Sequence, residues 1–343
     1  MKVTIRDVAQ QAGVSPATVS RVLNKPELVE PATRERVRNA IRVLDFQPNA
    51  IARGLSAQNS DTIGLVVPGI TDLFFGELYR GIERVSRRAG MKVLLFDAQH
   101  SRHRALEGFT FLRQHQVGGI VFTSKLVSED FDPVLERLGI PVVLALTQAT
   151  SKTPLHAFKV DDVKAVFDAV SYLVSRGHRR IGMLSGQIED DITGTLRLQG
   201  YRTGLLHYGI EFQASFVENG DYRFDSGYRA MQRLLRRQAE NRLTAVFAAS
   251  DEMAIGAIRC LHDNGLRVPE DLSVMGFDDL SVAHMVVPGL TTVAQPFAEI
   301  GERAVDQLLQ MRSAEGVHAG ATEYLPHRIV ERESVQTAPA GAS

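Results

Sequence analysis

The sequence contains a single cysteine and no tryptophan among its 343 residues. One cysteine, Cys260, excludes an internal disulfide framework and suits a reducing compartment, and its apolar neighbours indicate a buried, unreactive thiol. No apolar run approaches the ~18 residues that a membrane-spanning helix requires. Charged and polar residues interrupt the N-terminus from Lys2 onward, so we expect no secretory signal and a cytoplasmic protein.

Signatures of catalysis are also missing. The sequence has no Walker phosphate loop, no H-E-x-x-H pair and no G-x-S-x-G elbow, which are the marks of the main nucleotide hydrolases, metalloproteases and serine hydrolases. We therefore expect neither an enzyme nor a bound cofactor. A metal site is conceivable at four histidines, but their polar surroundings favour surface positions: His100, His103, His115 and His178.

Charge is distributed unevenly along the chain, although the net formal charge is only −1. The first 59 residues hold nine lysines and arginines against five acidic residues, whereas acidic residues are in excess over the remainder. A basic head on a slightly acidic body is typical of a protein that binds a polyanion with that head alone.

The basic head has the pattern of a helix-turn-helix. Thr4 can cap a first helix, Gly13 breaks it, and Ser15 can cap a second helix in which Pro16 occupies the first position. Such a pair places its second helix in a DNA major groove, although similar pairs also occur in small bundles that never meet DNA. A third helix begins at Glu30-Pro31, with four apolar residues spaced to close a small core: Val37, Ala40, Ile41 and Leu44.

From Asp61 onward the pattern changes to alternating strands and helices. This alternation predicts an α/β core of two doubly wound parallel sheets, whose ligands bind beyond the carboxyl ends of the strands. The predicted strands are 62–67, 91–96, 119–122 and 141–145, then 181–184, 216–217, 245–248 and 273–277; the predicted helices are 75–89, 101–115 and 130–138, then 162–176, 195–208, 225–237 and 251–264.

Four segments carry a family resemblance: 3–9 (VTIRDVA), 12–15 (AGVS), 18–24 (TVSRVLN) and 48–55 (PNAIARGL). They resemble the headpiece and hinge of the lactose-repressor (LacI/GalR) family of bacterial transcription regulators, and the likeness extends over residues 2–336. It implies an all-α headpiece (1–47), a hinge that is helical on DNA (48–60), a two-lobed core like periplasmic binding proteins (61–337) and a disordered tail (338–343). The expected N-lobe comprises 61–160 and 292–319, and the expected C-lobe 161–291 and 320–337.

The resemblance also assigns roles in DNA binding. Pro16, Ala17 and Arg21 fall at the family's base-reading positions, where an arginine can address a guanine edge with two hydrogen bonds. Leu55 matches a leucine that wedges into the minor groove, and Arg53 suits a phosphate. Phosphate contacts are further expected from polar residues of the headpiece, of which Thr18 and Ser20 can equally serve as caps: Thr4, Ser15, Thr18, Ser20 and Asn24.

Effector-binding positions follow in the same way. Arg197 and Asp278 match the family's ligand-binding arginine and aspartate, whose side chains suit paired hydroxyls. Phe74 and Phe75 match positions that present aromatic rings. Three further matches have a structural alternative: Asp161 as a lobe-crossing residue, Asp251 as a helix N-cap and Phe297 as core packing.

The sequence thus predicts a homodimeric repressor that binds a pseudo-palindromic operator and is released by a sugar or sugar derivative. Without leucine heptads after Met311, a dimer is expected rather than a tetramer. Two alternatives are a regulator with a purine or phosphorylated co-repressor and, from another class, a sugar-binding transport protein. The acidic loop at 187–192 disfavours an anionic ligand, and the basic headpiece disfavours transport.

Overall fold

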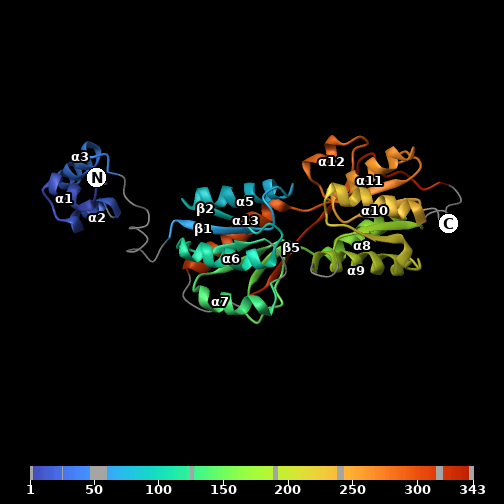
Figure 1. The fold of residues 1–343 in the computed structure, drawn as a ribbon, viewed down its shortest axis with the longest axis horizontal. Helices are drawn as coiled ribbons and strands as arrows, with labels where there is room; N and C mark the ends of the chain where they lie inside the picture. Colours follow the sequence, from blue (N-terminus) through green and yellow to red (C-terminus); the bar gives the residue numbers. More distant parts are fainter. Residues whose placement is uncertain are drawn as a thin grey trace. The chain divides into compact units, whose positions relative to one another are not determined.

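The computed structural model describes residues 3–24, 26–46, 60–123, 127–187, 192–237, 243–313 and 320–339. The chain divides into two compact units, Met1–Ser60 and Asp61–Ser343. Figure 1 colours the chain from blue at the N-terminus to red at the C-terminus. The first unit contains the predicted headpiece, 1–47, together with the predicted hinge, and the second begins where the predicted core begins, at Asp61. The predicted hinge, 48–60, lies outside the described residues except for Ser60.

The headpiece confirms the predicted helix-turn-helix pattern. The side chains and backbones of Thr4 and Asp7 form a reciprocal capping box, Gly13 ends the first helix with φ of 65°, and the Ser15 hydroxyl accepts from the Thr18 amide at 3.1 Å. Only glycine adopts that left-handed turn without cost. Buried Val8, Val19, Val37 and their neighbours form the core. The elements are α1 (Ile5–Ala12), α2 (Pro16–Asn24), the 3₁₀ turn η1 (Pro26–Leu28) and α3 (Pro31–Val43).

The core contains two six-stranded sheets. The first has the order β11-β5-β4-β3-β1-β2, and all of its pairs are parallel. The second has the order β12-β10-β9-β8-β6-β7, with only β12 antiparallel. The strands are β1 (Thr62–Val67), β2 (Lys92–Asp97), β3 (Ile120–Phe122), β4 (Val142–Ala145), β5 (His156–Val160), β6 (Ile181–Ser185), β7 (Val217–Asn219), β8 (Ala245–Ala248), β9 (Ser273–Asp278), β10 (Thr291–Ala294), β11 (Thr322–Leu325) and β12 (Arg328–Val330).

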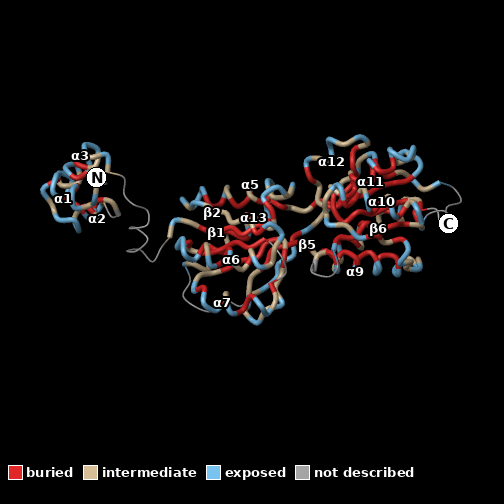
Figure 2. Tube along the Cα trace, viewed as in Figure 1, coloured by how far each residue is buried: buried red, intermediate tan, exposed pale blue. Residues whose placement is uncertain are grey.

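Helices cover both faces of each sheet. In β1, Leu65 packs with α5 and α13 on one face, whereas Val66 packs with α6 and α7 on the other. Because successive strand residues face opposite sides, strands buried on both faces are apolar throughout, and Figure 2 shows buried residues along both sheets. The helices are α5 (Phe75–Arg88), α6 (Arg102–Gln114), α7 (Asp132–Leu138), α8 (Asp162–Ser175), α9 (Ile192–His207), α10 (Phe224–Arg237), α11 (Asp251–Asp263), α12 (Ser281–Met285) and α13 (Phe297–Ser313), with 3₁₀ turns η2 (Glu129–Phe131) and η3 (Ala214–Phe216).

The predicted lobe boundaries need two corrections. β10, expected in the N-lobe, pairs with β9 in the second sheet. β11, expected in the C-lobe, pairs with β5 in the first sheet and thereby satisfies the backbone along that strand's outer edge. The chain therefore crosses between lobes after β5, between β10 and α13, and between β11 and β12. The N-lobe comprises 61–160 and 297–325, and the C-lobe 161–294 and 328–337.

Several buried groups tie these elements together. Cys260 is buried, as predicted, and burial raises the pKa of its thiol. His178 corrects a prediction, since it is buried rather than on the surface: its ring lies 3.0 Å from the Thr244 hydroxyl and 3.0 Å from the carbonyl oxygen of Gln336. Of the predicted disordered tail, 338–343, only its first two residues are described, and the Ala338 amide donates to the carbonyl oxygen of Arg176.

Candidate functional site

The headpiece presents its predicted base-reading residues to solvent. Pro16, Ala17 and Arg21 are exposed on α2, whose first turn begins at Pro16. Thr4 and Ser15, predicted to meet phosphates, are exposed but already cap α1 and α2. Thr18 and Ser20 are half-buried, the side chain of Asn24 is not among the described residues, and Arg53 and Leu55 lie outside them.

The core unit contains a cavity of about 410 Å³ lined by residues of both lobes. Its volume lies within the ~300–1,000 Å³ range of small-molecule pockets, and its walls follow the carboxyl ends of the strands, as expected for open α/β sheets. The wall includes four of the seven predicted effector residues: Phe74, Arg197, Asp278 and Phe297.

Arg197 is held on the cavity wall by a buried ion cluster. The Nε of Arg197 donates to Asp162 at 2.9 Å, and Lys159 Nζ lies 2.9 Å from the other carboxylate oxygen of Asp162. The guanidinium of Arg197 stacks on Phe277, 3.8 Å from the ring centroid. Burial acts to raise the pKa of Asp162, but the two cations hold it below its ordinary value. Asp162 stays ionised, so the arginine fork is fixed in place before a ligand arrives.

Asp278 ends strand β9 beside this cluster. Gln295 donates to Asp278 Oδ1 at 2.7 Å. The backbone φ of Asp278, 121°, lies in a region that non-glycine residues rarely adopt. Burial raises the pKa of Asp278 to about 7, against the opposing effect of Arg197. A carboxylate held near its titration point in a cavity is a common feature of binding sites.

Aromatic rings form the apolar part of the wall. Phe74 and Phe297 stack with centroids 5.7 Å apart. Phe297 is buried in the N-lobe core, as its structural alternative predicted, and it also lines the cavity. Tyr222 adds a third ring. Phe75 is not on the wall; it packs against Tyr79 one helical turn onward.

Asp161 and Asp251 do not line the cavity either. Asp161 is the N-cap of α8 and accepts from the Lys164 amide at 3.0 Å, which favours its structural alternative. Asp251 is fully buried behind the wall, and the cap of α11 is Ser250 instead.

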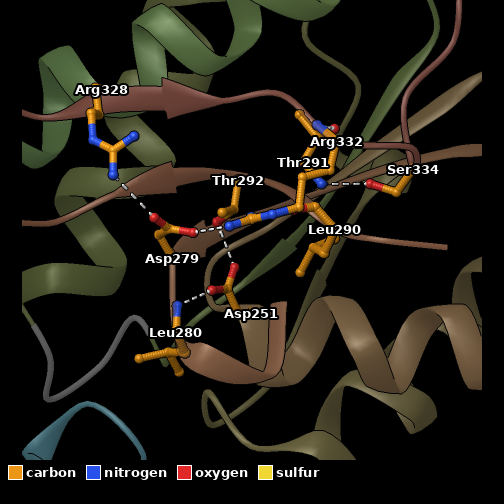
Figure 3. A network of polar contacts seen from close by, with 9 residues as sticks. All are labelled: Asp251, Asp279, Leu280, Leu290, Thr291, Thr292, Arg328, Arg332 and Ser334. Atoms are coloured by element: carbon orange, nitrogen blue, oxygen red, sulfur yellow. Dashed lines mark hydrogen bonds and ion pairs between the residues drawn. The ribbon is translucent and has the colours of Figure 1, made fainter. Parts of the chain in front are cut away.

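Asp251 joins the segment after β9 to strand β10, as Figure 3 shows. It accepts from the Leu280 amide at 2.7 Å and from the Thr292 hydroxyl at 2.5 Å. Nearby, Asp279 pairs with Arg332 at 2.6 Å and with Arg328 at 3.4 Å. These bonds brace the loop that carries the cavity residue Asp278.

We predict that Asp251→Ala lowers the free energy of unfolding by about 2–4 kcal/mol, because it leaves a buried amide and hydroxyl without their acceptor. Burial and the negative charge of Asp278 raise the pKa of Asp251 well above its ordinary value, so the charged form of this side chain is costly in the folded state. The neutral isostere Asp251→Asn should therefore cost less than half as much. Urea unfolding of both variants tests this, and equal losses would contradict it.

Sequence reasoning missed several wall residues. Lys159 lies on β5, a strand that was not predicted, and Tyr222 follows the predicted strand at 216–217, where attention to every strand end would have found it. Among the described residues, the wall holds three cationic and five acidic side chains, which is an excess of acidic groups. Four residues of the predicted acidic loop, 188–191, lie outside the described residues. The charged wall residues are Lys159, Arg197 and Arg223, and Asp72, Asp162, Asp221, Glu252 and Asp278.

Comparisons with known proteins agree with both units. Residues 4–49 match the model of bacterial regulatory proteins of the lacI family, and residues 170–335 match a periplasmic binding protein-like domain. Catabolite control protein A of Priestia megaterium is 38% identical over 98% of this chain and 100% of its own. Among solved structures, the lac repressor dimer bound to operator and the anti-inducer ONPF has a TM-score of 0.86 at 28% identity, covering 98% of this chain and 100% of that one. The transcriptional regulator CelR–cellobiose complex has a TM-score of 0.74 at 33% identity, covering 97% and 100%.

A helix-turn-helix headpiece joined to a two-lobed core with a small-molecule cavity defines a DNA-binding transcription regulator rather than an enzyme. The chain belongs to the lacI family of bacterial regulatory proteins. No helix in the described part of the chain is long and apolar enough to span a bilayer.

Proposed function

We propose that this regulator is a cytoplasmic homodimeric repressor that leaves its operator when an uncharged polyhydroxy compound, a sugar or sugar derivative, fills the cavity. The observation that carries the effector class is the composition of the wall. Arg197 and Asp278 supply a donor fork and an acceptor pair for vicinal hydroxyls, and Phe74 supplies an apolar face for a sugar ring. The relative CelR is described as a cellobiose complex, which supports the same class.

The charge of the cavity wall favours a neutral sugar over the phosphorylated co-repressor considered above. The wall has an excess of acidic side chains, and its buried arginine is already paired with Asp162. A phosphate group would enter an acidic, partly desolvated cavity, where like-charge repulsion opposes its binding. We therefore place phosphorylated metabolites and sugar acids below neutral sugars in affinity.

The effector proposal is tested by the thermal unfolding of the full chain against matched pairs of compounds, each sugar beside its phosphate and its acid. A ligand that binds only the folded state raises the melting temperature. We expect at least one neutral member to do so and its phosphate to do so less. A phosphate that stabilises the protein more than its parent sugar would overturn the assignment.

Operator binding is proposed to follow the family pattern, with one headpiece on each half of a pseudo-palindrome. The hinge, 48–60, would become helical on DNA with Leu55 in the minor groove and Arg53 on a phosphate, so that a change in lobe spacing alters operator affinity. The lac repressor relative is described as a dimer bound to operator, which supports this assembly.

Arg21 is the residue that we expect to carry most of the base discrimination. Arg21→Ala should weaken operator binding by about 10- to 100-fold, corresponding to ~1–3 kcal/mol for one bidentate guanine contact, with little change for random DNA. Fluorescence anisotropy on a selected operator and on random duplex measures both. The exposed arginine Arg38 of α3 serves as the control; if Arg38→Ala removes as much discrimination, α2 is not the reading helix.

A further inference from the structure

Four polar side chains that follow strand ends contribute to the cavity wall, two from each lobe. Asp72 follows β1 and His100 follows β2 in the N-lobe, whereas Arg223 follows β7 and Glu252 follows β8 in the C-lobe. All four residues line the cavity. The equivalent edges of the two sheets thus face each other through charged side chains.

Arg223 crosses from one lobe to the other. Its Nη2 donates to Asp72 Oδ1 at 2.6 Å and to His100 Nε2 at 2.8 Å. His100 Nε2 also lies 3.2 Å from Asp72 Oδ1, so the three side chains form one cluster. Asp72 is only 10% exposed, which places one side of the ion pair in a largely desolvated position, where the attraction is stronger than between two exposed side chains.

Glu252 of the C-lobe lies beside this bridge. Burial raises the pKa of its carboxyl group, whereas the charge of Arg223 and the backbone amides of Phe224, in its own lobe, and Leu73, in the opposite lobe, act to lower it. The Arg223 bridge can exist only while the lobes are together.

We propose that Arg223 is a positioning residue for effector binding, which holds the two lobes together over the cavity by bridging to Asp72 and His100. This inference rests on the proposed function for its consequence, but the bridge itself can be tested without an effector. A contact present in only one of two conformations shifts their equilibrium by its own free energy, and a ligand that needs that conformation gains affinity by the same factor.

The chain offers a matched control. Arg233, on α10, pairs with Glu218 at 2.6 Å, and the exposed fractions of the two arginines are 43% and 42%, with 7% and 10% for their carboxylate partners. Both arginines therefore contribute an ion pair of the same length and burial. The two pairs differ in that Arg233 pairs within the C-lobe, where Glu218 also pairs with Arg237 at 2.8 Å, whereas Arg223 pairs across the cavity.

Hydrogen exchange of the effector-free full chain tests the bridge. In Arg223→Gln and in Asp72→Asn, we expect the amides of 69–75 and 220–226 to exchange about 2- to 10-fold faster, the range for a partly exposed ion pair. The double variant should exchange no faster than either single variant, because both remove one interaction. Arg223→Lys should recover part of the protection, and Arg233→Gln should leave both segments unchanged.

Effector affinity gives the second readout. A neutral sugar that stabilises the wild type should bind Arg223→Gln about 2- to 10-fold more weakly and Arg233→Gln equally well. Unchanged exchange in both segments, or equal exchange changes in the Arg233 control, overturns the bridge. Faster exchange in a protein to which none of the sugars binds supports the bridge and contradicts the proposed effector class instead.

Discussion

Arg197→Ala is expected to bind operator as tightly as the wild type and to lose its response to the effector. The side chain supplies charge-assisted hydrogen bonds to the ligand, each worth roughly 1.5–3 kcal/mol, so two of them correspond to a loss of affinity of about 100-fold or more. The fold should survive because Asp162 keeps Lys159 at 2.9 Å as a buried partner.

The measurement is an operator titration with and without effector, together with the effector affinity itself. Arg202→Ala is the control, since Arg202 lies on the same helix but stacks on Phe212 with its guanidinium 4.3 Å from the ring centroid. Release of the Arg197 variant at the wild-type effector concentration would show that the cavity wall has been misassigned.

Asp278→Asn is expected to weaken effector binding by about 10- to 100-fold and at the same time to stabilise the effector-free protein above pH 7. The amide removes a charge-assisted acceptor from the ligand. It also removes the cost of ionising a carboxyl group whose pKa burial raises to about 7. Asparagine keeps the acceptor for Gln295 and has the same side-chain shape as aspartate at this position.

The sign of the pH dependence follows from proton linkage. A carboxyl group with a raised pKa binds its proton more tightly in the folded state, so wild-type stability falls as the pH rises from about 4 to about 7 and then levels off. The rise of the pKa corresponds to at most about 4 kcal/mol, and exposure to the cavity reduces the expected gain to about 1–3 kcal/mol. Urea unfolding of variant and wild type at pH 5 and pH 8 measures it, and a gain that is larger at pH 5 would contradict the assignment.

Local signals predicted the headpiece well. Ser15, Pro16 and Gly13 each act through their own backbone or that of a residue within three positions, so their sequence context is sufficient. The same is true of the strands buried on both faces. Lobe boundaries were harder, because whether β10 or β11 joins one sheet or the other depends on which edge strand is unpaired, and that is a long-range property.

The candidate site shows the same difference between local and long-range signals. Arg197 and Asp278 were predicted from family resemblance, but their partners Asp162 and Gln295 lie 35 and 17 positions away in sequence. Phe75 was expected beside Phe74, yet adjacent residues at a helix start point about 100° apart, and only Phe74 lies on the wall. The Asp72–Arg223 bridge spans 151 positions and both lobes, so no local pattern indicates it.

The most direct test of the account is an anisotropy titration of a selected operator by the full chain, with and without a saturating neutral sugar found by thermal unfolding. We expect the sugar to weaken operator binding at least 10-fold in the wild type and not at all in Arg197→Ala. Operator affinity that stays unchanged while the cavity is saturated would contradict the claim that this cavity controls DNA binding.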